Sequence, residues 1–245
     1  PQVVLHATSL AGAQQLPLRG ERVATLMMVA DGVGGVAGGA EASQLAVEAI
    51  MGYVSSSLRC YHLAGGAHGG EFGAALRSAA FQAHAAVRAE AAAHGDGSKM
   101  ATTLTLAIII WPWVYVVQVG DSRCYRYLSG EIAQITKDQT MAQALVDQGV
   151  LSREKVTRSP LNNVLVSAIG GDQAEPDVSR FDIRDRRSVI LLCSDGLTKH
   201  VTDAELAEHL DRMTSSEQLC RELLELALSR GGSDNITILA GRAPA

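Results

Sequence analysis

The chain is poor in cysteine, and the cysteines that it has do not pair in sequence. It contains four in 245 residues, and no two of them form a Cys-x-x-Cys motif: Cys60, Cys124, Cys193 and Cys220. Widely spaced cysteines are typical of small buried side chains in a reducing compartment, not of a disulfide framework. No signal peptide is visible either, so we expect a cytoplasmic protein.

A basic stretch and a membrane-spanning segment are both missing. The net charge is −5, from 21 basic and 26 acidic residues, and no cluster of lysines and arginines stands out. This composition argues against nucleic acid or an anionic membrane surface as a partner. The longest apolar stretch, residues 104–119, is interrupted by Pro112 and Gln118. It fits two strands joined near Pro112 better than a membrane span.

Several catalytic signatures are also absent. No P-loop lysine follows the glycines of residues 34–39, and neither the metalloprotease motif HExxH nor the hydrolase motif Gly-x-Ser-x-Gly occurs. A phospho-aspartyl phosphatase would carry Asp-x-Asp after its first strand, but that place is taken by Val33. The chain has 47% apolar residues and no repeat, low-complexity tract or linker. We therefore expect a single domain, residues 1–245.

The sequence does contain a recurring pattern of an aspartate beside a short apolar run. Short apolar runs bounded by glycine are typical of buried strands. The acids and their runs are Asp31 after residues 26–30, Asp121 after 114–119, Asp195 after 189–193, and Asp234 before 236–240. One aspartate after a strand is ordinary turn chemistry, but four predict that the acids gather at one edge of a sheet system.

Gathered carboxylates repel one another unless a cation neutralises them, and a hard divalent ion is the natural occupant. Asp31, Asp195 and Asp234 could share one ion or bridge two ions roughly 4 Å apart. Water held between two such ions loses a proton near neutral pH, while the ions neutralise phosphate oxygens. The pattern therefore predicts metal-assisted hydrolysis, with a phosphate ester as the favoured substrate.

The order of the predicted elements favours an α+β fold. Consecutive strands with short turns predict antiparallel hairpins over residues 101–119 and 123–135. The other predicted strands are residues 23–30, 178–183, 188–193 and 235–240, and the predicted helices are 40–58, 71–94, 138–148, one from 152, one from 202 or 203, and 216–229. This order is typical of packed antiparallel sheets with helices outside them, rather than of alternating βαβ units.

Five motifs, in order along the chain, resemble those of the type-2C metal-dependent protein phosphatases, the PPM family, in its bacterial form. They are residues 29–35 (VADGVGG), 101–104 (ATTL), 119–123 (VGDSR), 193–197 (CSDGL) and 232–237 (GSDNIT). Residues 137–149 and 159–170 resemble the flap region of that family. The resemblance extends over residues 23–241. It implies a four-layer αββα sandwich of two antiparallel β-sheets flanked by helices.

The resemblance also implies hydrolysis of phosphoserine and phosphothreonine in proteins by a water that bridges two Mn²⁺ or Mg²⁺ ions. Asp31 would bridge the two ions, and the carbonyl of Gly32 would bind the second. Asp195 and Asp234 would hold the first ion, which makes these two and Asp31 the candidate catalytic residues. Asp121 would serve the third, weaker metal ion of bacterial members. The implied partners are phosphorylated proteins and a cognate Ser/Thr protein kinase.

The chain departs from the family pattern before the first aspartate. Family members carry there an arginine, followed closely by an acidic motif that helps to hold the second metal ion. Gln14 and Gln15 stand about where the acid is expected, and the charged residues nearby have a different spacing: Arg19, Glu21 and Arg22. We therefore expect the N-terminal motif to be divergent or to lie upstream of Pro1.

Further departures lie near Asp195 and in the flap. Lys199 replaces an acid often found four residues after Asp195, and Gln139 replaces a common histidine. Lys199 is a surface residue, weakens the third metal ion, or supplies a positive charge itself. Ser122 and Arg123 are expected to fix the end of the strand before them. The departures support an alternative function, a phosphatase-fold protein with weakened catalysis that acts as a regulatory binding module.

Overall fold

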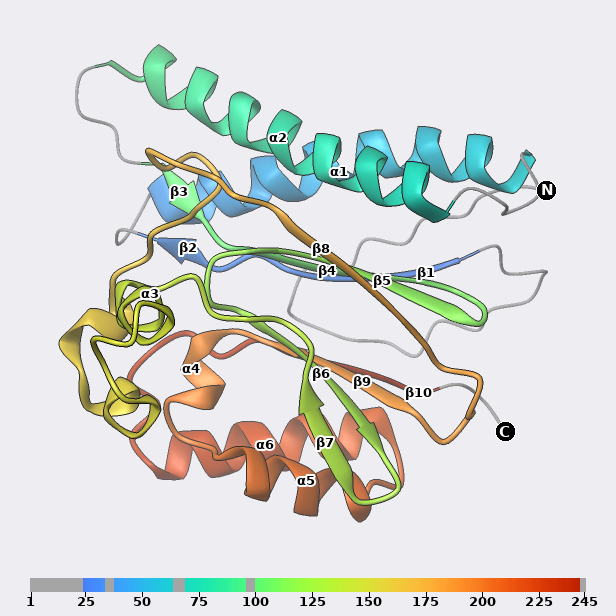
Figure 1. Cartoon of the computed structure of the whole chain (residues 1–245), viewed down its shortest axis with the longest axis vertical. Coiled ribbons are helices and arrows are strands. Elements are labelled where there is room, and N and C mark those ends of the chain that lie inside the picture. The colour runs from blue at the N-terminus through green and yellow to red at the C-terminus, as the bar shows by residue number, and fades with distance from the viewer. Residues whose placement is uncertain (1–23, 34–37, 64–68, 96–99, 243–245) are drawn as a thin grey trace.

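The chain folds as a sandwich of two antiparallel sheets with helices on both outer faces, and the computed structural model in Figure 1 shows these layers. The structure describes residues 24–33, 38–63, 69–95 and 100–242. The covering helices are α1 (Gly38–Leu63) and α2 (Gly69–Ala93) on the first sheet, and α5 (Asp203–Asp211) and α6 (Ser216–Ser229) on the second. The predicted αββα sandwich is confirmed.

Each main sheet has four antiparallel strands. The first sheet runs in the order β1 (Thr25–Val29), β4 (Leu104–Ile110), β5 (Trp113–Val119) and β8 (Asp177–Asp182). The second runs in the order β10 (Ile238–Arg242), β9 (Val189–Cys193), β6 (Arg123–Leu128) and β7 (Glu131–Gln134). A short pair, β2 (Gly32–Val33) and β3 (Ala101–Thr102), adjoins them. The predicted hairpins are confirmed, since β4 pairs with β5 and β6 pairs with β7.

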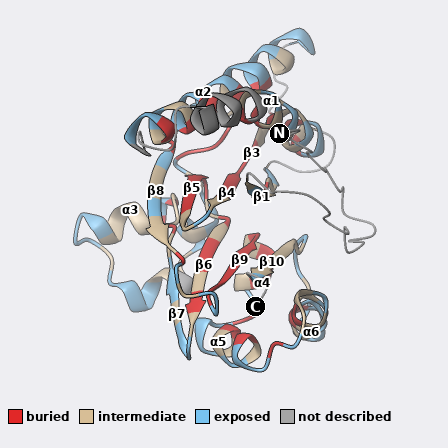
Figure 2. Cartoon of the chain, turned by 90° about the vertical axis from the view of Figure 1, so that its right-hand side faces the viewer, coloured by how far each residue is buried: buried red, intermediate tan, exposed pale blue. Residues whose placement is uncertain are grey.

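Alternation along the strands divides the core into three layers. In β5, Tyr115 and Val117 face helices α1 and α2, whereas Val114 and Val116 face the other sheet. The strand β9 repeats this pattern between the second sheet's helices and the sandwich centre. Period-two alternation is what a strand buried on both faces requires when each face packs on a different layer. Figure 2 shows the buried residues concentrated in these central strands.

Capping side chains set the beginnings of three helices. Thr202, not Asp203, caps α5, and a capping box joins it to Glu205. Ser215 caps α6, which has the predicted bounds. The helix predicted over 138–148 begins later, as α3 (Met141–Asp147), because the Thr140 side chain accepts the Gln143 N–H and starts the helix there.

Besides α3 and the longer α1, three segments differ from the prediction. The closing strand begins at Ile238 rather than at residue 235, because Thr237 exchanges backbone and side-chain hydrogen bonds with Ser194 instead. The segment from residue 152 forms two 3₁₀ helices, η1 (Arg153–Arg158) and η2 (Pro160–Asn163). A single helical turn, α4 (Asp195–Thr198), was not predicted, since one turn is too short to show a helical period.

The structure also bears on two expected absences. Within the described ranges, no helix is long and apolar enough to cross a membrane. Cys124 and Cys193 are free and buried, as predicted for small core side chains, and Cys220 is free and half-buried. The side chain of Cys60 lies outside the described residues.

Candidate active site

The four aspartates predicted beside strands come together at one end of the sandwich. Asp31 and Asp121 follow β1 and β5 of the first sheet, whereas Asp195 begins α4 just after β9, and Asp234 precedes β10. Asp31 is within hydrogen-bonding distance of Asp195 and close to the charge of Asp234, and Asp121 is close to Asp195 and Asp31. This is the end where Figure 1 shows β2, β3 and α4. The predicted gathering of acids at one sheet edge is confirmed.

The carboxylates make one another harder to ionise. Burial, reinforced by the charges of Asp195 and Asp234, raises the pKa of Asp31 to about 7. Burial and the charge of Asp195 likewise raise the pKa of Asp121 to about 7. A cation placed among these groups would remove the repulsion and compensate the burial. The cluster is therefore electrostatically suited to a positive ligand.

Two buried threonines fix the backbone of Asp31. Its N–H donates to Thr103 Oγ1 at 3.0 Å, and its carbonyl accepts from the Thr103 N–H at 2.8 Å. The same carbonyl accepts from Thr102 Oγ1 at 2.9 Å. Because Thr102 and Thr103 are buried, these bonds are shielded from water, and they hold the main chain at Asp31 in one conformation.

Thr103, together with Thr105, joins the Asp31 loop to the Asp121 loop. Thr103 Oγ1 lies 2.8 Å from the hydroxyl of Ser122, the residue after Asp121. The Ser122 carbonyl accepts from Thr105 Oγ1, also at 2.8 Å. This agrees with the prediction that Ser122 fixes the strand end. Neutral hydroxyl groups thus connect the two acids of the first sheet.

In the second sheet, Asp195 and Asp234 are brought together by the residues beside them. The Ser194 hydroxyl donates to the carbonyl of Asn235 and accepts from the N–H of Thr237, both at 3.0 Å. A Cβ on Gly196 would lie only 2.3 Å from the Asn235 carbonyl oxygen. Only glycine permits this approach of the two loops.

Lys199 supplies a positive charge between these two acids. Its Nζ lies 2.6 Å from Oδ2 of Asp195 and 2.6 Å from Oδ2 of Asp234. Burial alone would lower the pKa of Lys199, but its hydrogen bonds to the two carboxylates raise it above the usual value. The hydrogen bond from Lys199 also lowers the pKa of Asp234. Of the alternatives left open by the sequence, the structure favours a lysine that supplies charge over a surface lysine.

The segment after β7 is anchored beside Asp121. Arg123 grips Asp138 with two parallel bonds, Nε to Oδ1 at 2.9 Å and Nη2 to Oδ2 at 2.7 Å. Gln139 Oε1 accepts the Gly120 N–H at 2.9 Å, and the Gln139 N–H donates to the Gly120 carbonyl at 3.0 Å. Arg123 thus fixes more than the strand end, because it ties the start of the predicted flap to the site.

Gly32 lies beside Asp31 in a close contact between β2 and α1. A Cβ on Gly32 would come within 2.4 Å of the backbone of Gly39. Glycine is therefore required there for the beginning of α1 to approach the Asp31 loop.

The departures from the family pattern near the N-terminus lie outside the described residues. They are Gln14, Gln15 and the charged residues 19, 21 and 22.

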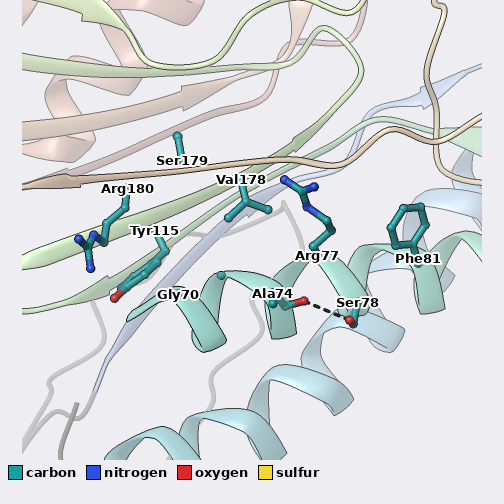
Figure 3. A pocket seen from close by; sticks show the side chains of 10 residues that line it. Gly70, Ala74, Arg77, Ser78, Phe81, Tyr115, Val178, Ser179 and Arg180 are labelled. Atoms are coloured by element: carbon teal, nitrogen blue, oxygen red, sulfur yellow. Dashed lines mark hydrogen bonds between the residues drawn. The ribbon is translucent and has the colours of Figure 1, made fainter. Parts of the chain in front are cut away.

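Two other features of the described chain lie apart from the aspartates. Glu41, Glu90 and His94 place ligand atoms within 4.8 Å of one another, but the group is largely exposed. A pocket between α2 and β8 is lined by small and apolar residues and by Arg77 and Arg180 (Figure 3). None of the four aspartates lines this pocket, so the site rests on the carboxylate cluster and not on the pocket.

Sequence reasoning gave no role to Thr103 or Asp138. Thr103 carried a signal, because two adjacent threonines at the start of a predicted buried strand need hydrogen-bond partners. Asp138 carried none, since nothing in the sequence shows that it pairs with Arg123, which lies 15 residues away.

Comparison with known proteins gives consistent matches. Residues 18–229 match the profile of the family described as Protein phosphatase 2C. The serine/threonine protein phosphatase PstP of Mycobacterium tuberculosis is 37% identical over 218 residues, which are 88% of this chain and 40% of that protein. The serine/threonine phosphatase stp of Listeria monocytogenes is 30% identical over 215 residues, which are 87% of this chain and 82% of that protein.

A solved structure agrees with these matches. The catalytic domain of PstP in complex with two manganese ions superposes with a TM-score of 0.73 and 32% identity, over 93% of this chain and 94% of that one. The chain thus spans nearly the whole of that catalytic domain but only about 40% of the full-length mycobacterial relative.

Proposed function

We propose, because this chain belongs to the protein phosphatase 2C family, that it hydrolyses phosphoserine and phosphothreonine in proteins with the help of divalent metal ions. The observation that carries the proposal is the cluster of Asp31, Asp121, Asp195 and Asp234 at one end of the sandwich. The proposal treats residues 1–245 as one phosphatase domain. It places the protein in the cytoplasm, where its free buried thiols fit a reducing environment.

The side chains of the cluster suit a hard divalent ion. Carboxylate oxygens are the donors that Mg²⁺ and Mn²⁺ take, and burial and mutual repulsion already hold the pKa of Asp31 near 7. The position between Asp195 and Asp234 also attracts a cation, since the ammonium of Lys199 lies there. These features support two ions, with manganese or magnesium as the candidates. The manganese ions of the PstP catalytic domain favour manganese.

In the proposed centre, Asp31 would help to hold both ions, and the carbonyl of Gly32 would help to hold the second. Asp195 and Asp234 would hold the first ion, and Asp121 would serve a third, weaker position. When bound, such ions lower the pKa of water toward neutrality and neutralise the charge that develops on the phosphate.

The chain's own residues keep these donors in place. Thr102 and Thr103 fix the main chain of Asp31, and Ser122 connects it to Asp121. Ser194 and Gly196 hold the Asp195 loop against the Asp234 loop. Preorganised donors need no rearrangement during the reaction, which is the main contribution that a protein makes to phosphoryl transfer.

The proposed substrates are phosphorylated proteins, and a Ser/Thr protein kinase is the proposed source of the phosphate groups. The test is hydrolysis of p-nitrophenyl phosphate and of a phosphoserine peptide, each with Mn²⁺ and with a chelator. The proposal predicts turnover of both substrates that the chelator abolishes. Turnover that the chelator leaves intact, or none at all in Mn²⁺, would contradict it.

A second candidate function is a regulatory binding module with weakened catalysis. The observation that favours it is Lys199, which already neutralises Asp195 and Asp234. This alternative predicts that a phosphorylated peptide binds without being hydrolysed in Mn²⁺. Hydrolysis of that peptide at rates usual for enzymes, roughly 1–1,000 per second, would exclude it.

A further inference from the structure

Lys199 lies where a metal ion would contact Asp195 and Asp234. Its ammonium nitrogen is 2.6 Å from one oxygen of each carboxylate. The ammonium of Lys199 therefore occupies the position between the two acids where a metal ion would bind. The positive charge at this position comes from a side chain of the protein itself.

The oxygens of Asp234 that an ion would use are already engaged. Oδ2 accepts from Lys199 at 2.6 Å, and Oδ1 accepts from the backbone N–H of Asn235 at 2.9 Å. Asn235 is the neighbouring residue in sequence, so this second bond belongs to the local turn. Each oxygen keeps a second lone pair, but an ion that binds Asp234 through Oδ2 would lie beside the Lys199 ammonium, and the two positive charges would repel each other.

The fold holds Lys199 in this position. Its N–H donates to the Asp195 carbonyl at 2.9 Å, which closes the single turn of α4 and places the lysine one turn after the acid. Its side chain is 28% exposed, against 61% for Lys137, which pairs with Asp147 on the surface. Lys199 is thus held among the acids more firmly than an ordinary surface lysine.

We propose that the ammonium of Lys199 is a built-in competitor of the divalent ion at Asp195 and Asp234. This inference rests on the proposed function, since it assumes that these acids bind an ion. In the metal-free protein Lys199 neutralises the two carboxylates and stabilises the fold. When an ion binds, the flexible lysine stem carries the ammonium away from the acids, and the cost of breaking its two contacts lowers the affinity for the ion.

A different role would give the opposite result. If Lys199 served to hold the two carboxylates in a geometry suited to an ion, its removal would weaken ion binding. Such positioning groups typically contribute about 10–100-fold to metal affinity. The sign of the change on removing Lys199 therefore separates competition from positioning.

The experiment is a calorimetric Mn²⁺ titration of the wild-type protein and of Lys199→Met, with thermal unfolding of both in the absence of metal. Competition predicts that Lys199→Met binds one ion roughly tenfold or more tightly, because the ion no longer has to displace a positive charge. It also predicts that the metal-free variant unfolds at a lower temperature, because two carboxylates have lost their counter-charge. Lys199→Gln is a second neutral variant, to be used if the methionine variant does not fold without metal.

Two controls define the effect. Lys199→Arg keeps the charge and should bind Mn²⁺ about as weakly as the wild type. Lys137→Met makes the same substitution and the same change in net charge in an exposed pair of equal N–O distance, 2.6 Å, and should leave Mn²⁺ affinity unchanged.

Equal or weaker Mn²⁺ binding by the neutral Lys199 variants would overturn the inference. If the wild type still hydrolysed p-nitrophenyl phosphate in Mn²⁺, the proposed function would stand without it. If neither wild type nor variants bound Mn²⁺, and no turnover occurred, the inference and the proposed function would fail together.

Discussion

The two sheets position their acids by different means. Asp31 and Asp121, after strands of the first sheet, are held by the buried hydroxyls of Thr102, Thr103 and Ser122. Asp195 and Asp234, in the second sheet, are bridged by the ammonium of Lys199. Within the part of the chain that the structure describes, the first pair has no direct ion pair, since Lys199 acts on Asp31 only through its more distant charge. The second pair is compensated directly.

This difference shows which pair of acids an added cation would stabilise more. Burial is the largest influence on the first pair and raises the pKa of Asp31 and of Asp121 to about 7, although the charge of Lys199 lowers that of Asp31. The hydrogen bond from Lys199 instead lowers the pKa of Asp234. We therefore expect the first-sheet half to be destabilised by its own charge until a metal ion binds, and the second-sheet half to be stable without one.

The largest expected effect is the loss of activity on removing the charge of Asp31, in the first-sheet half of the site. Asp31→Asn keeps the shape of the side chain but removes the carboxylate that is proposed to serve both ions. We expect Mn²⁺-dependent hydrolysis of p-nitrophenyl phosphate to fall by roughly a hundredfold or more. The matched control is Asp147→Asn, an exposed aspartate that pairs with Lys137. Full activity of Asp31→Asn would show that Asp31 has been misassigned.

Gly196→Ala should separate the Asp195 loop from the Asp234 loop in the second-sheet half of the site. The added Cβ would meet the Asn235 carbonyl at 2.3 Å, so the backbone has to move, at a cost of about 3 kcal/mol in the free energy of unfolding. Gly52→Ala is the control, since it has open space around it in α1 and should stabilise the protein by roughly 0.5–1 kcal/mol. Urea unfolding measures the change in the free energy of unfolding for both variants. Equal changes would contradict the close contact at Gly196.

Thr103→Val should destabilise the Asp31 and Asp121 loops in the first-sheet half of the site. It keeps the size of the side chain but leaves the Asp31 N–H and the Ser122 hydroxyl without this partner. We expect a loss of about 2 kcal/mol in the free energy of unfolding. Thr214→Val, at an exposed hydroxyl that donates to Gln218, should cost less than half of this. Comparable losses in the two variants would mean that the buried network contributes little.

The smallest effect is a pH dependence of the metal-free protein. The folded-state pKa of Asp31 is raised from 3.8 to about 7, so between these values the folded protein holds a proton that the unfolded chain has lost. Stability must then fall as pH rises through this window. With allowance for solvent screening, we expect a decline of about 1 kcal/mol that Asp31→Asn removes. Urea unfolding at about pH 5 and pH 7.5 measures it, and parallel profiles for both proteins would refute it.

The sequence predicted the fold and the aspartates well because both leave local signals. Short apolar runs bounded by turn residues identified the strands, and each acid stands beside one of them. The contact of Lys199 with Asp195 and Asp234 gave no such signal, because it depends on α4, a single turn, and on a loop 35 residues away. The pairing of Arg123 with Asp138 and the hydroxyl network behind Asp31 are also tertiary contacts, which spacing alone does not reveal.

The measurement that tests the central claim most directly is a crystal structure of the protein grown with Mn²⁺. We predict ions bound by Asp31, Asp195 and Asp234, with the Lys199 ammonium withdrawn from both carboxylates. Manganese bound only at the exposed group of Glu41, Glu90 and His94, with Lys199 still bridging Asp195 and Asp234, would contradict the account.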